Sequence, residues 1–481
     1  MYIKLSKYFF YRKKNNLIYL FNQLNYAERY YELDAMDFFE VLSKEAQTID
    51  TIINELLKTF DVGKNELLRD YLEFIEDLAK DGFVITGNSI AEIEEKEPKF
   101  TYKNFAKSSP SNQSTENIKD NEHISSISDI KAKDELFVEN LYLEVTRRCN
   151  EKCKHCYIPQ NQRSKGDFIS LEDAKNFIDQ AKELGIWELT ITGGEPFLHP
   201  KIIEILRYAR ERGVIIAILS NLTVLKDKHI EVLKEIYPSH IQVSLYSLNP
   251  DVHDAITCLK GSHQKTIAAI EKCYANDIPL QVNCPIIDLN KNDYQEVLKW
   301  VSAKGMKANA DFNIMAQTDF ELSNMEHTLS YGNAKHVFKE MVQDDKQMLN
   351  DYKEMLTKDT NNLPDKNRHV CGAAFNTLHI SSKGKVYPCA NWQSFELGDL
   401  HNETLKEIYL NGKKTKAVRN IKFSKYMDTI GKDLFPFTKI CPSHFANSNQ
   451  GDFTKIPNDV LENARMKKEA VEEIIRDNKN R

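Results

Sequence analysis

The chain has 481 residues, enough for about three domains, and its formal net charge is −6. This acidic balance, without a Lys/Arg stripe on any predicted helix, argues against nucleic acid as a partner. No run of about 18 apolar residues is present and basic residues interrupt the N-terminal apolar runs, so neither a membrane span nor a signal peptide is predicted. Nine cysteines in such a chain favour metal ligands in a reducing cytoplasm over a disulfide framework.

The first segment, residues 1–93, has the pattern of a small α+β domain. Alternating apolar residues predict three short strands, and three helical stretches and a final extended segment follow. The predicted strands are 2–11, 17–21 and 30–33, the helices are 36–45, 48–60 and 64–82, and the extended segment is 83–86.

This order of elements, with the run 48–62 near its centre, resembles the PQQ-peptide-chaperone-like domain called the RiPP recognition element. The resemblance implies a winged-helix-like peptide-binding domain, in which the leader sequence of a precursor peptide adds a strand to the sheet edge. A winged-helix DNA-binding domain has a similar element order and is the alternative, which the acidic charge disfavours. Residues 94–135 are polar and predict a linker, because they hold too few apolar side chains to bury a core.

Residues 136–320 alternate predicted strands with helices, a pattern typical of parallel β/α units. The six predicted strands are 141–146, 187–192, 214–219, 240–245, 279–284 and 310–315. Six such units predict an α/β fold, a partial (β/α)6 barrel, with ligands at the carboxyl ends of its strands.

Three cysteines follow the first of these strands with Cys-x3-Cys-x2-Cys spacing: Cys149, Cys153 and Cys156. One short loop can aim three thiolates at a common point, and thiolates are the ligands of iron-sulfur clusters. Three ligands would leave one iron of a four-iron cluster open for a small molecule. A structural zinc site or three unrelated thiols are the alternatives.

The loop resembles the cluster motif of the radical S-adenosylmethionine (SAM) enzymes, in which the open iron holds SAM and the reduced cluster cleaves it to a 5′-deoxyadenosyl radical. The run Gly193, Gly194, Glu195 and Pro196 after the second strand matches the family's Gly-Gly-Glu-Pro element. Two glycines let a backbone approach a ligand closely, and a carboxylate can pair with the ammonium group of SAM. The resemblance thus implies a barrel of radical SAM type.

Weaker matches to the family's SAM-binding positions follow in order. Ser220 and Asn221 resemble its Ser/Thr-Asn pair, and Ser244 ends the fourth strand, where a hydroxyl can reach the ribose. Tyr157 resembles the aromatic position beside the adenine. Ser262 is carried over from the segment after the fourth strand, where Lys260 replaces the usual arginine. Each is also compatible with simple turn chemistry.

A second cysteine group follows a predicted helical bridge, 321–370. The run 379–387 predicts a β-hairpin with Lys383 and Gly384 in its turn, which brings Cys371 and Cys389 together at its open end. Cys441 follows later, with His444 three residues beyond it. The remaining thiols, Cys258, Cys273 and Cys284, lack partners at ligand spacing and are expected in the core. The tail 457–481 predicts a charged helix.

The segment 371–456 resembles the auxiliary-cluster extensions of radical SAM enzymes called SPASM and Twitch domains. The family's Cys-x2-Cys-x5-Cys-x3-Cys run is missing, and only Cys441 and His444 stand where it would begin. The resemblance therefore implies one auxiliary 4Fe-4S cluster held by Cys371, Cys389 and Cys441, besides the radical SAM cluster. His444, a substrate group or nothing would complete it. Packed core thiols are the alternative.

Together these resemblances imply a maturase of a ribosomally made precursor peptide, which installs a thioether or carbon-carbon cross-link. They imply SAM and two 4Fe-4S clusters as cofactors, and flavodoxin or ferredoxin as electron donor. A peptide epimerase, a sulfatase-type formylglycine maturase and a non-catalytic iron-sulfur protein are the alternatives. The precursor, the bond, any acid/base residue and the oligomeric state are not specified by the sequence.

Overall fold

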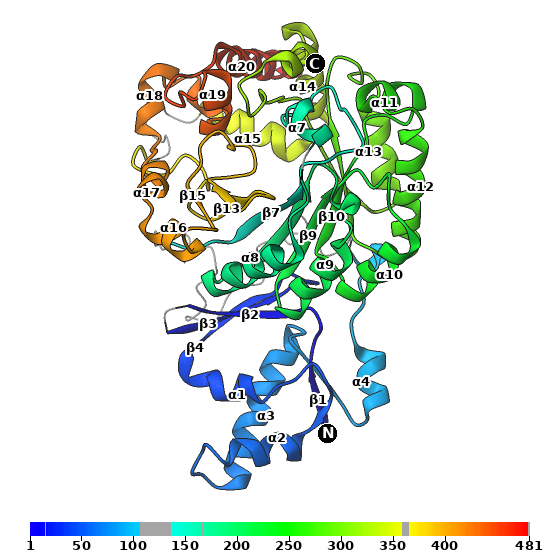
Figure 1. Ribbon diagram of the computed structural model, residues 1–481, viewed down its shortest axis with the longest axis vertical. Coiled ribbons are helices and arrows are strands. Elements are labelled where there is room, and N and C mark those ends of the chain that lie inside the picture. Colours follow the sequence, from blue (N-terminus) through cyan, green and yellow to red (C-terminus); the bar gives the residue numbers. More distant parts are fainter. Residues whose placement is uncertain (15, 106–135, 166, 358–364, 480–481) are drawn as a thin grey trace. The chain divides into compact units, whose positions relative to one another are not determined.

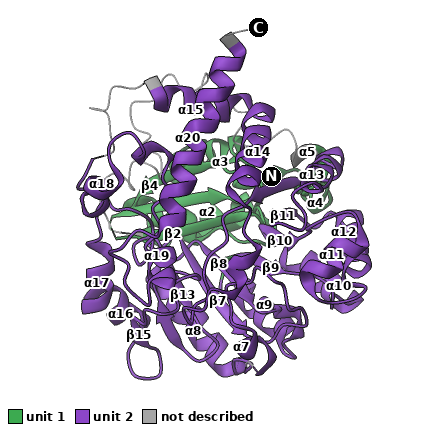
Figure 2. Cartoon of the chain, turned by 90° about the horizontal axis from the view of Figure 1, so that it is seen from above, with its two compact units in different colours: residues 1–137, 213–215 green, residues 138–212, 216–481 purple. Residues whose placement is uncertain are grey.

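The computed structural model describes residues 1–14, 16–105, 136–165, 167–357 and 365–479, so most of the predicted linker, 94–135, lies outside the described residues. The chain forms two compact units, one of residues 1–137 with 213–215 and one of residues 138–212 with 216–481 (Figure 2). No described helix is long and apolar enough to cross a membrane.

The N-terminal unit contains two small sheets and a helical layer. One sheet has the order β5-β1-β6 and the other β2-β3-β4. The strands are β1 (Tyr2–Leu5), β2 (Phe9–Lys14), β3 (Leu17–Asn22), β4 (Glu28–Glu32), β5 (Gln47–Thr48) and β6 (Val84–Gly87), and the helices are α1 (Met36–Glu40), α2 (Ile49–Leu56), α3 (Lys64–Lys80), α4 (Ile90–Lys96) and α5 (Tyr102–Phe105). Apolar residues of both sheets and of α1, α2 and α3 form one core.

The prediction of one strand over 2–11 is wrong, because β1 and β2 belong to different sheets. The chain turns at Ser6, whose buried N–H donates to the carbonyl of Phe83 (2.9 Å) and whose Oγ accepts from the N–H of Tyr8 (3.2 Å). The alternating pattern continues through this turn, so it did not reveal the break. The three helices are confirmed, although each ends earlier than predicted.

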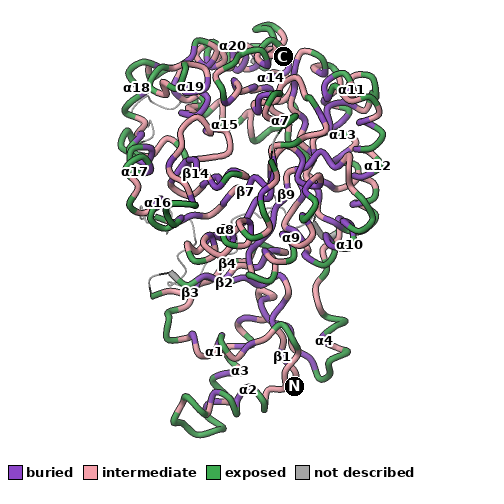
Figure 3. The backbone as a smooth tube through the Cα atoms, viewed as in Figure 1, coloured by how far each residue is buried: buried purple, intermediate pink, exposed green. Residues whose placement is uncertain are grey.

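The second unit is built on one nine-stranded sheet of order β12-β11-β10-β9-β8-β7-β13-β14-β15. Its first six strands are β7 (Asn140–Thr146), β8 (Glu188–Gly193), β9 (Ile215–Ser220), β10 (His240–Ser244), β11 (Leu280–Pro285) and β12 (Lys307–Asp311). They alternate with the helices α7 (Gln160–Lys165), α8 (Leu171–Leu184), α9 (Ile202–Glu211), α10 (Asp227–Ile236), α11 (Pro250–Thr257), α12 (Ser262–Ala275) and α13 (Tyr294–Ala303), as Figure 1 shows. The partial six-stranded barrel is confirmed, and β7 and β9 are among its most buried strands (Figure 3).

The sixth strand was predicted at 310–315 but begins and ends earlier, as β12. Its own residues are largely polar and half-exposed, whereas the buried Phe312 and Ile314 come after it. Ile314 packs in a separate apolar cluster with Tyr246, Ile256 and Ile287. The apolar alternation that suggested a strand therefore belongs to the loop at its carboxyl end.

The C-terminal hairpin continues the barrel sheet. Its strand β13 (Thr377–Ile380) pairs in parallel with β7, and β14 (Lys385–Tyr387) and β15 (Gly398–Asp399) follow in antiparallel. The remaining helices are α14 (Tyr331–Asp344), α15 (Lys346–Thr357), α16 (Leu405–Asn411), α17 (Lys413–Arg419), α18 (Ser424–Ile430), α19 (Pro442–Ser448) and α20 (Asn458–Lys479). The predicted hairpin, bridge helices and charged C-terminal helix are thus present, and the two cysteine groups share one sheet.

Candidate functional site

The first cysteine group lies in the loop that leaves the carboxyl end of β7. Two main-chain hydrogen bonds tie this loop to the last turn of α11. The N–H of Lys152 donates to the carbonyl of Thr257 (2.9 Å), and that of Lys154 to Ile256 (3.0 Å). The backbone between the first and third cysteine is therefore held by the barrel itself.

The thiols of this loop interact electrostatically. Burial raises the pKa of Cys149 to about 12 and also raises that of Cys156. Burial likewise raises the pKa of Cys153, and the charges of Glu151, Cys156 and Cys149 add to the rise. The charge of Cys156 acts on both Cys149 and Cys153, so the thiols share one region of the loop, and their ligation of a common cluster stays a prediction.

The second group consists of Cys371, Cys389 and Cys441. The N–H of Ala374 donates to the carbonyl of Pro388 (3.0 Å), which joins the segment after Cys371 to the one before Cys389. Burial, with the charge of Cys441 among the smaller causes, raises the pKa of Cys371 to about 11 and that of Cys389 to about 12. The segments of Cys371 and Cys389 thus lie side by side as predicted, whereas ligation of one cluster by Cys371, Cys389 and Cys441 stays a prediction.

Backbone donors distinguish these thiols from the core ones. Four of them accept an N–H from the residue two positions later. The pairs are Cys149 with Glu151, Cys156 with Ile158, Cys371 with Ala373, and Cys389 with Asn391. For the buried Cys273 and Cys284, the causes of the raised pKa are burial and one charged side chain. The prediction of a core position is wrong for Cys258, which is exposed because it caps the C-terminal end of α11. An N–H aimed at sulfur favours the thiolate and is one of the ways proteins tune iron-sulfur clusters.

The described His, Cys, Asp and Glu side chains contain no group of three arranged for a single metal ion. A four-iron cluster has a different requirement, because each thiolate binds a different iron atom. The two cysteine groups, with their N–H donors, therefore fit clusters better than a single zinc ion.

The Gly-Gly-Glu-Pro run binds the cysteine loop through its backbone. A Cβ on Gly193 would lie 2.0 Å from the carbonyl oxygen of Thr146, and one on Gly194 would lie 2.3 Å from that of Arg148. The N–H groups of Gly194 and Glu195 donate to these same two oxygens, both at 2.8 Å. The glycines are needed here for close approach of two protein segments, whereas the sequence suggested approach to a ligand.

Glu195 is fully buried and joins this run to the end of β9. Its carboxylate accepts hydrogen bonds from the N–H of Phe197 (2.9 Å), the Oγ of Ser220 (2.8 Å) and the N–H of Asn221 (2.8 Å). Burial raises its pKa to about 7, against the effect of these donors. Pro196 begins a short 3-10 helix after it. Pairing of Glu195 with the SAM ammonium group stays a prediction.

The other predicted SAM residues differ in their surroundings. Asn221 points Nδ2 toward Cys149 Sγ (3.8 Å), and Ser244 ends β10, so both lie at carboxyl strand ends as predicted. Burial and then the charge of Cys156 raise the pKa of Tyr157. Ser262 is fully buried, and its Oγ donates to Asp254 (2.8 Å). That hydroxyl already has a protein partner, so its cofactor role stays a prediction without geometric support.

Three residues beside the cysteines were not identified from the sequence. The carboxylate of Glu151 lies 3.2 Å from Cys153 Sγ, and the Tyr246 hydroxyl donates to the same sulfur at 3.8 Å. The ring of His155 packs edge-on against Tyr246, with centroids 5.2 Å apart. The position of Glu151 and His155 between the cysteines was the available signal, whereas Tyr246 was recognisable only from the fold.

His444 has a different partner from the one predicted. Its Nε2 lies 3.1 Å from the carboxylate of Asp459 in α20, while its Nδ1 is buried without a hydrogen-bond partner among the described residues. Among the described residues, Nε2 of His444 thus has a hydrogen-bond partner and Nδ1 has none. Ligation of the auxiliary cluster by His444 stays a prediction.

In the N-terminal unit, β4 is an edge strand, paired with β3 in the described sheet. Its Tyr31 packs against Phe39 and Phe74, and Arg29 forms ion pairs with Asp77 and Asp81 of the α3 region. The side of β4 that faces the helices therefore carries one aromatic side chain, Tyr31, and one charged side chain, Arg29. An edge strand is the kind of element to which an extended peptide can add as a further strand.

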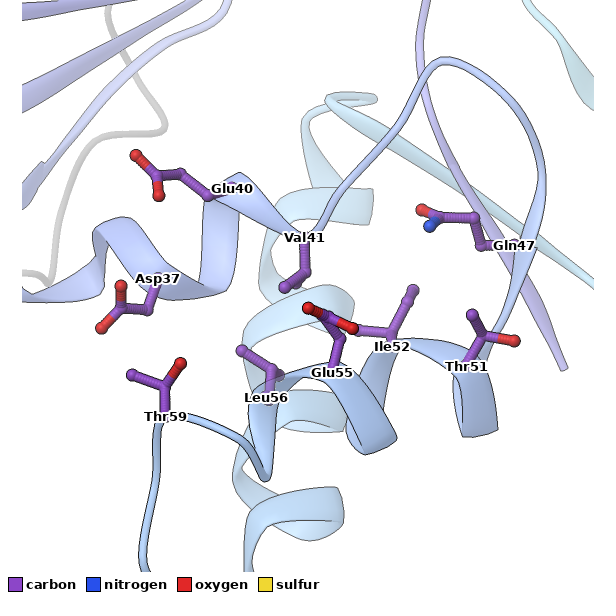
Figure 4. Close-up of a pocket in the computed structure, with 9 residues that line it drawn as sticks. All are labelled: Asp37, Glu40, Val41, Gln47, Thr51, Ile52, Glu55, Leu56 and Thr59. Carbon is purple, nitrogen blue, oxygen red and sulfur yellow. The ribbon is translucent and has the colours of Figure 1, made fainter.

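A cavity of about 430 Å³ lies between α1, β5 and α2 in the same unit (Figure 4). Its lining includes the buried side chains of Ile52 and Leu56 and three carboxylates, from Asp37, Glu40 and Glu55. No basic residue lines it in the described chain. Glu40 and Glu55 pair with Lys13 and Lys58 (3.1 and 2.6 Å), so the acidic lining is partly neutralised.

Comparison with protein-family models identifies the modules. The model of the radical SAM superfamily matches residues 143–301, which hold the cysteine loop and the Gly-Gly-Glu-Pro run. The chain contains a radical SAM domain over these residues. The SPASM iron-sulfur cluster-binding domain matches residues 371–432, and coenzyme PQQ synthesis protein D (PqqD) matches residues 24–84. These modules bring SAM and 4Fe-4S clusters, with an auxiliary cluster in the C-terminal part; Cys441 lies beyond the matched range.

Relatives of the chain include the antilisterial bacteriocin subtilosin biosynthesis protein AlbA of Bacillus subtilis, 28% identical over 304 residues. That match spans 62% of this chain and 65% of the relative's length. The AdoMet-dependent heme synthase of Methanosarcina barkeri is 24% identical over 292 residues, 58% of this chain and 83% of the relative.

Two solved structures have the same fold. Streptococcus suis SuiB bound to precursor peptide SuiA is 12% identical with a TM-score of 0.59, covering 94% of this chain and 100% of that one. The enzyme anSMEcpe with bound AdoMet is 17% identical with a TM-score of 0.56, covering 70% and 98%. At these identities the likeness concerns the fold alone.

Proposed function

We propose that this radical SAM protein modifies a ribosomally synthesised precursor peptide and installs a thioether or carbon-carbon cross-link in it. The observation that carries the proposal is the joining, in one chain, of a cluster-binding barrel with a PqqD-like unit that has an exposed sheet edge. A small-molecule enzyme has no evident use for such an edge. The names of AlbA and of the SuiB complex agree with a peptide substrate.

The N-terminal unit is the proposed site of leader binding. A leader segment would add a strand to β4 and place side chains against the apolar residues between β4 and α3, among them Tyr31 and Phe74. Backbone hydrogen bonds give affinity for any extended chain, so the pockets beside the strand set the selectivity. Holding the leader there raises the local concentration of the core peptide at the barrel.

In the barrel, Cys149, Cys153 and Cys156 would hold the catalytic cluster, and Cys371, Cys389 and Cys441 the auxiliary one. When bound, the first cluster with SAM supplies the radical that removes a substrate hydrogen atom. The chain's own residues prepare this site by holding the loop to α11 and by shielding the sulfurs from water. Burial raises the pKa of these thiols, and backbone N–H groups of Glu151 and Ile158 partly oppose that rise at Cys149 and Cys156.

The experiment uses anaerobically reconstituted full-length protein with SAM, a reductant and the product of a short peptide gene beside its own. Mass spectrometry is expected to show the loss of two hydrogens per cross-link, and Cys153→Ala is the inactive control. An unchanged peptide mass with 5′-deoxyadenosine formed would instead identify an epimerase. If the Cys153→Ala variant kept its full biological function, the protein would instead be a non-catalytic iron-sulfur protein.

Leader deletion separates the remaining candidates. A leader-guided maturase loses its activity when the leader is removed, whereas a sulfatase-type formylglycine maturase acts on an internal motif and keeps it. The heme synthase relative favours a tetrapyrrole substrate as a second candidate. Turnover of an iron porphyrin precursor in place of the peptide would select it.

The proposed electron donor is a flavodoxin or ferredoxin, because the reaction requires a one-electron reductant at low potential. The proposed compartment is the cytoplasm, where thiols stay reduced until a cluster is loaded. Replacing the chemical reductant by a purified flavodoxin system tests the first point.

A further inference from the structure

A cluster of polar side chains lies between the two cysteine groups of the second unit. We call it the Glu144 network, and its members are Glu144, Arg147, Gln162, His379, Ser382 and Gln393. Glu144 and His379 are each 1% exposed. Burying such groups is costly unless they are paired, and well-packed apolar residues would serve stability as well. A role in fixing geometry is therefore worth testing.

Arg147 connects three parts of the fold. Its Nε donates to both carboxylate oxygens of Glu144 in β7 (3.0 and 3.3 Å). Its two terminal nitrogens donate to Gln162 in α7 and to Gln393, which follows Cys389 by four residues. The planar guanidinium makes these contacts in fixed directions, which a lysine ammonium cannot reproduce.

The contacts of Gln393 fix its orientation. Its Oε1 accepts from Arg147, so its Nε2 is the group that donates to the carbonyl of Ala390 (3.0 Å) and to His379 Nε2 (3.2 Å). That ring nitrogen is then an acceptor. It also lies 3.8 Å from Glu144, too far for a hydrogen bond.

The turn of the C-terminal hairpin closes the network. The N–H and Oγ of Ser382 both donate to Glu144 (3.3 and 3.1 Å). Since β13 also pairs with β7, with His379 opposite Tyr142, the hairpin is bound to β7 by backbone and by side chains.

We propose that Arg147 is a positioning residue that locks the loop of Cys149 to the segment of Cys389, so that the two iron-sulfur sites keep a fixed separation and orientation. Arg147 precedes Cys149 by two residues, and Gln393 is its contact on the auxiliary side. Replacing Gln393 should therefore change the position of the loop that holds the radical SAM cluster, although Gln393 lies in the segment of the other cysteine group. The inference concerns the clusters alone and holds for any substrate.

The test uses reconstituted full-length protein with Gln393→Ala, Arg147→Lys and the control Glu396→Ala. Glu396 lies in the same segment but is 40% exposed and pairs with Lys385 outside the network. Electron paramagnetic resonance of the reduced protein is recorded as SAM is added, because the cluster with an open iron responds to SAM. A second measurement follows the magnetic interaction between the two reduced clusters.

Gln393→Ala and Arg147→Lys are expected to weaken the SAM response about tenfold and to alter the interaction between the clusters, while Glu396→Ala matches the wild type. A purely structural role would lower thermal stability without changing either spectrum. Unaltered spectra in both network variants overturn the proposal. Arg147→Lys keeps the charge, so it separates geometry from electrostatics if Gln393→Ala fails to fold.

Discussion

Replacing Gly194 by alanine tests whether the Gly-Gly-Glu-Pro run holds the cysteine loop. The new Cβ would lie 2.3 Å from the carbonyl oxygen of Arg148 and 2.5 Å from that of Arg147. The two segments would have to separate by roughly 0.7 Å before the contact became tolerable. The hydrogen bonds from Gly194 to Thr146 and from Glu195 to Arg148, both 2.8 Å, cross the same gap and would lengthen.

The expected cost has two parts. Overpacking at a rigid site costs about 1 to 3 kcal/mol, and each weakened hydrogen bond adds about 0.5 to 1.5 kcal/mol. Gly194→Ala should therefore destabilise the second unit by about 4 kcal/mol. Gly185→Ala is the matched control: its φ is +82° and no atom lies within 4 Å of its Cβ. Backbone strain alone costs the control about 1 kcal/mol.

Tryptophan fluorescence during denaturant unfolding of iron-free protein measures both variants. The chain's three tryptophans, Trp187, Trp300 and Trp392, all lie in the second unit, so the signal reports that unit. Gly194→Ala should unfold at clearly lower denaturant than Gly185→Ala. Equal midpoints would show that the loop shifts without cost, and the close approach of the two segments would then not explain the glycines.

Three further outcomes are expected. The neighbouring His379, and after it Arg147 and Ser382, lower the pKa of the buried Glu144 to about 2 despite the burial penalty. Its stabilising charge is therefore present above about pH 4.5 and is lost as the pH falls toward 2, and acid unfolding of Glu144→Gln should lack that component. Cys441→Ala should reduce reconstituted iron from about eight to about four per chain, and unchanged iron would exclude Cys441 as a ligand. Glu32→Pro in β4 should weaken precursor binding about tenfold or more, whereas Glu32→Ala, which keeps the N–H, should bind. Equal binding by both would place the leader elsewhere.

The features predictable from sequence were those encoded within one short segment. The cysteine loop, the Gly-Gly-Glu-Pro run and the 379–387 hairpin each carry their own spacing or turn residues, and each lies where the strand pattern placed it. Strand order followed from the βαβ rule, since consecutive parallel strands lie side by side.

The predictions that failed concern features that depend on contacts between segments distant in the sequence. The glycines at 193 and 194 are explained by Thr146 and Arg148, more than 40 residues away, and Glu195 by residues at the end of β9. Likewise, the apolar residues after β12 pack on neighbouring loops, so their alternation resembles a strand without forming one. Periodicity shows that side chains are buried, but not which element buries them.

The two cysteine groups are related through β7. This strand pairs in parallel with β8 on one edge and with β13 on the other, and the first cysteine loop begins where β7 ends. The ladder between β7 and β13 fixes the two strands from which these groups extend, because moving one strand relative to the other would break several backbone hydrogen bonds. The Glu144 network acts beyond the end of this ladder and orients the loops there. This division explains why loss of Gln393 should alter the clusters while the sheet remains folded.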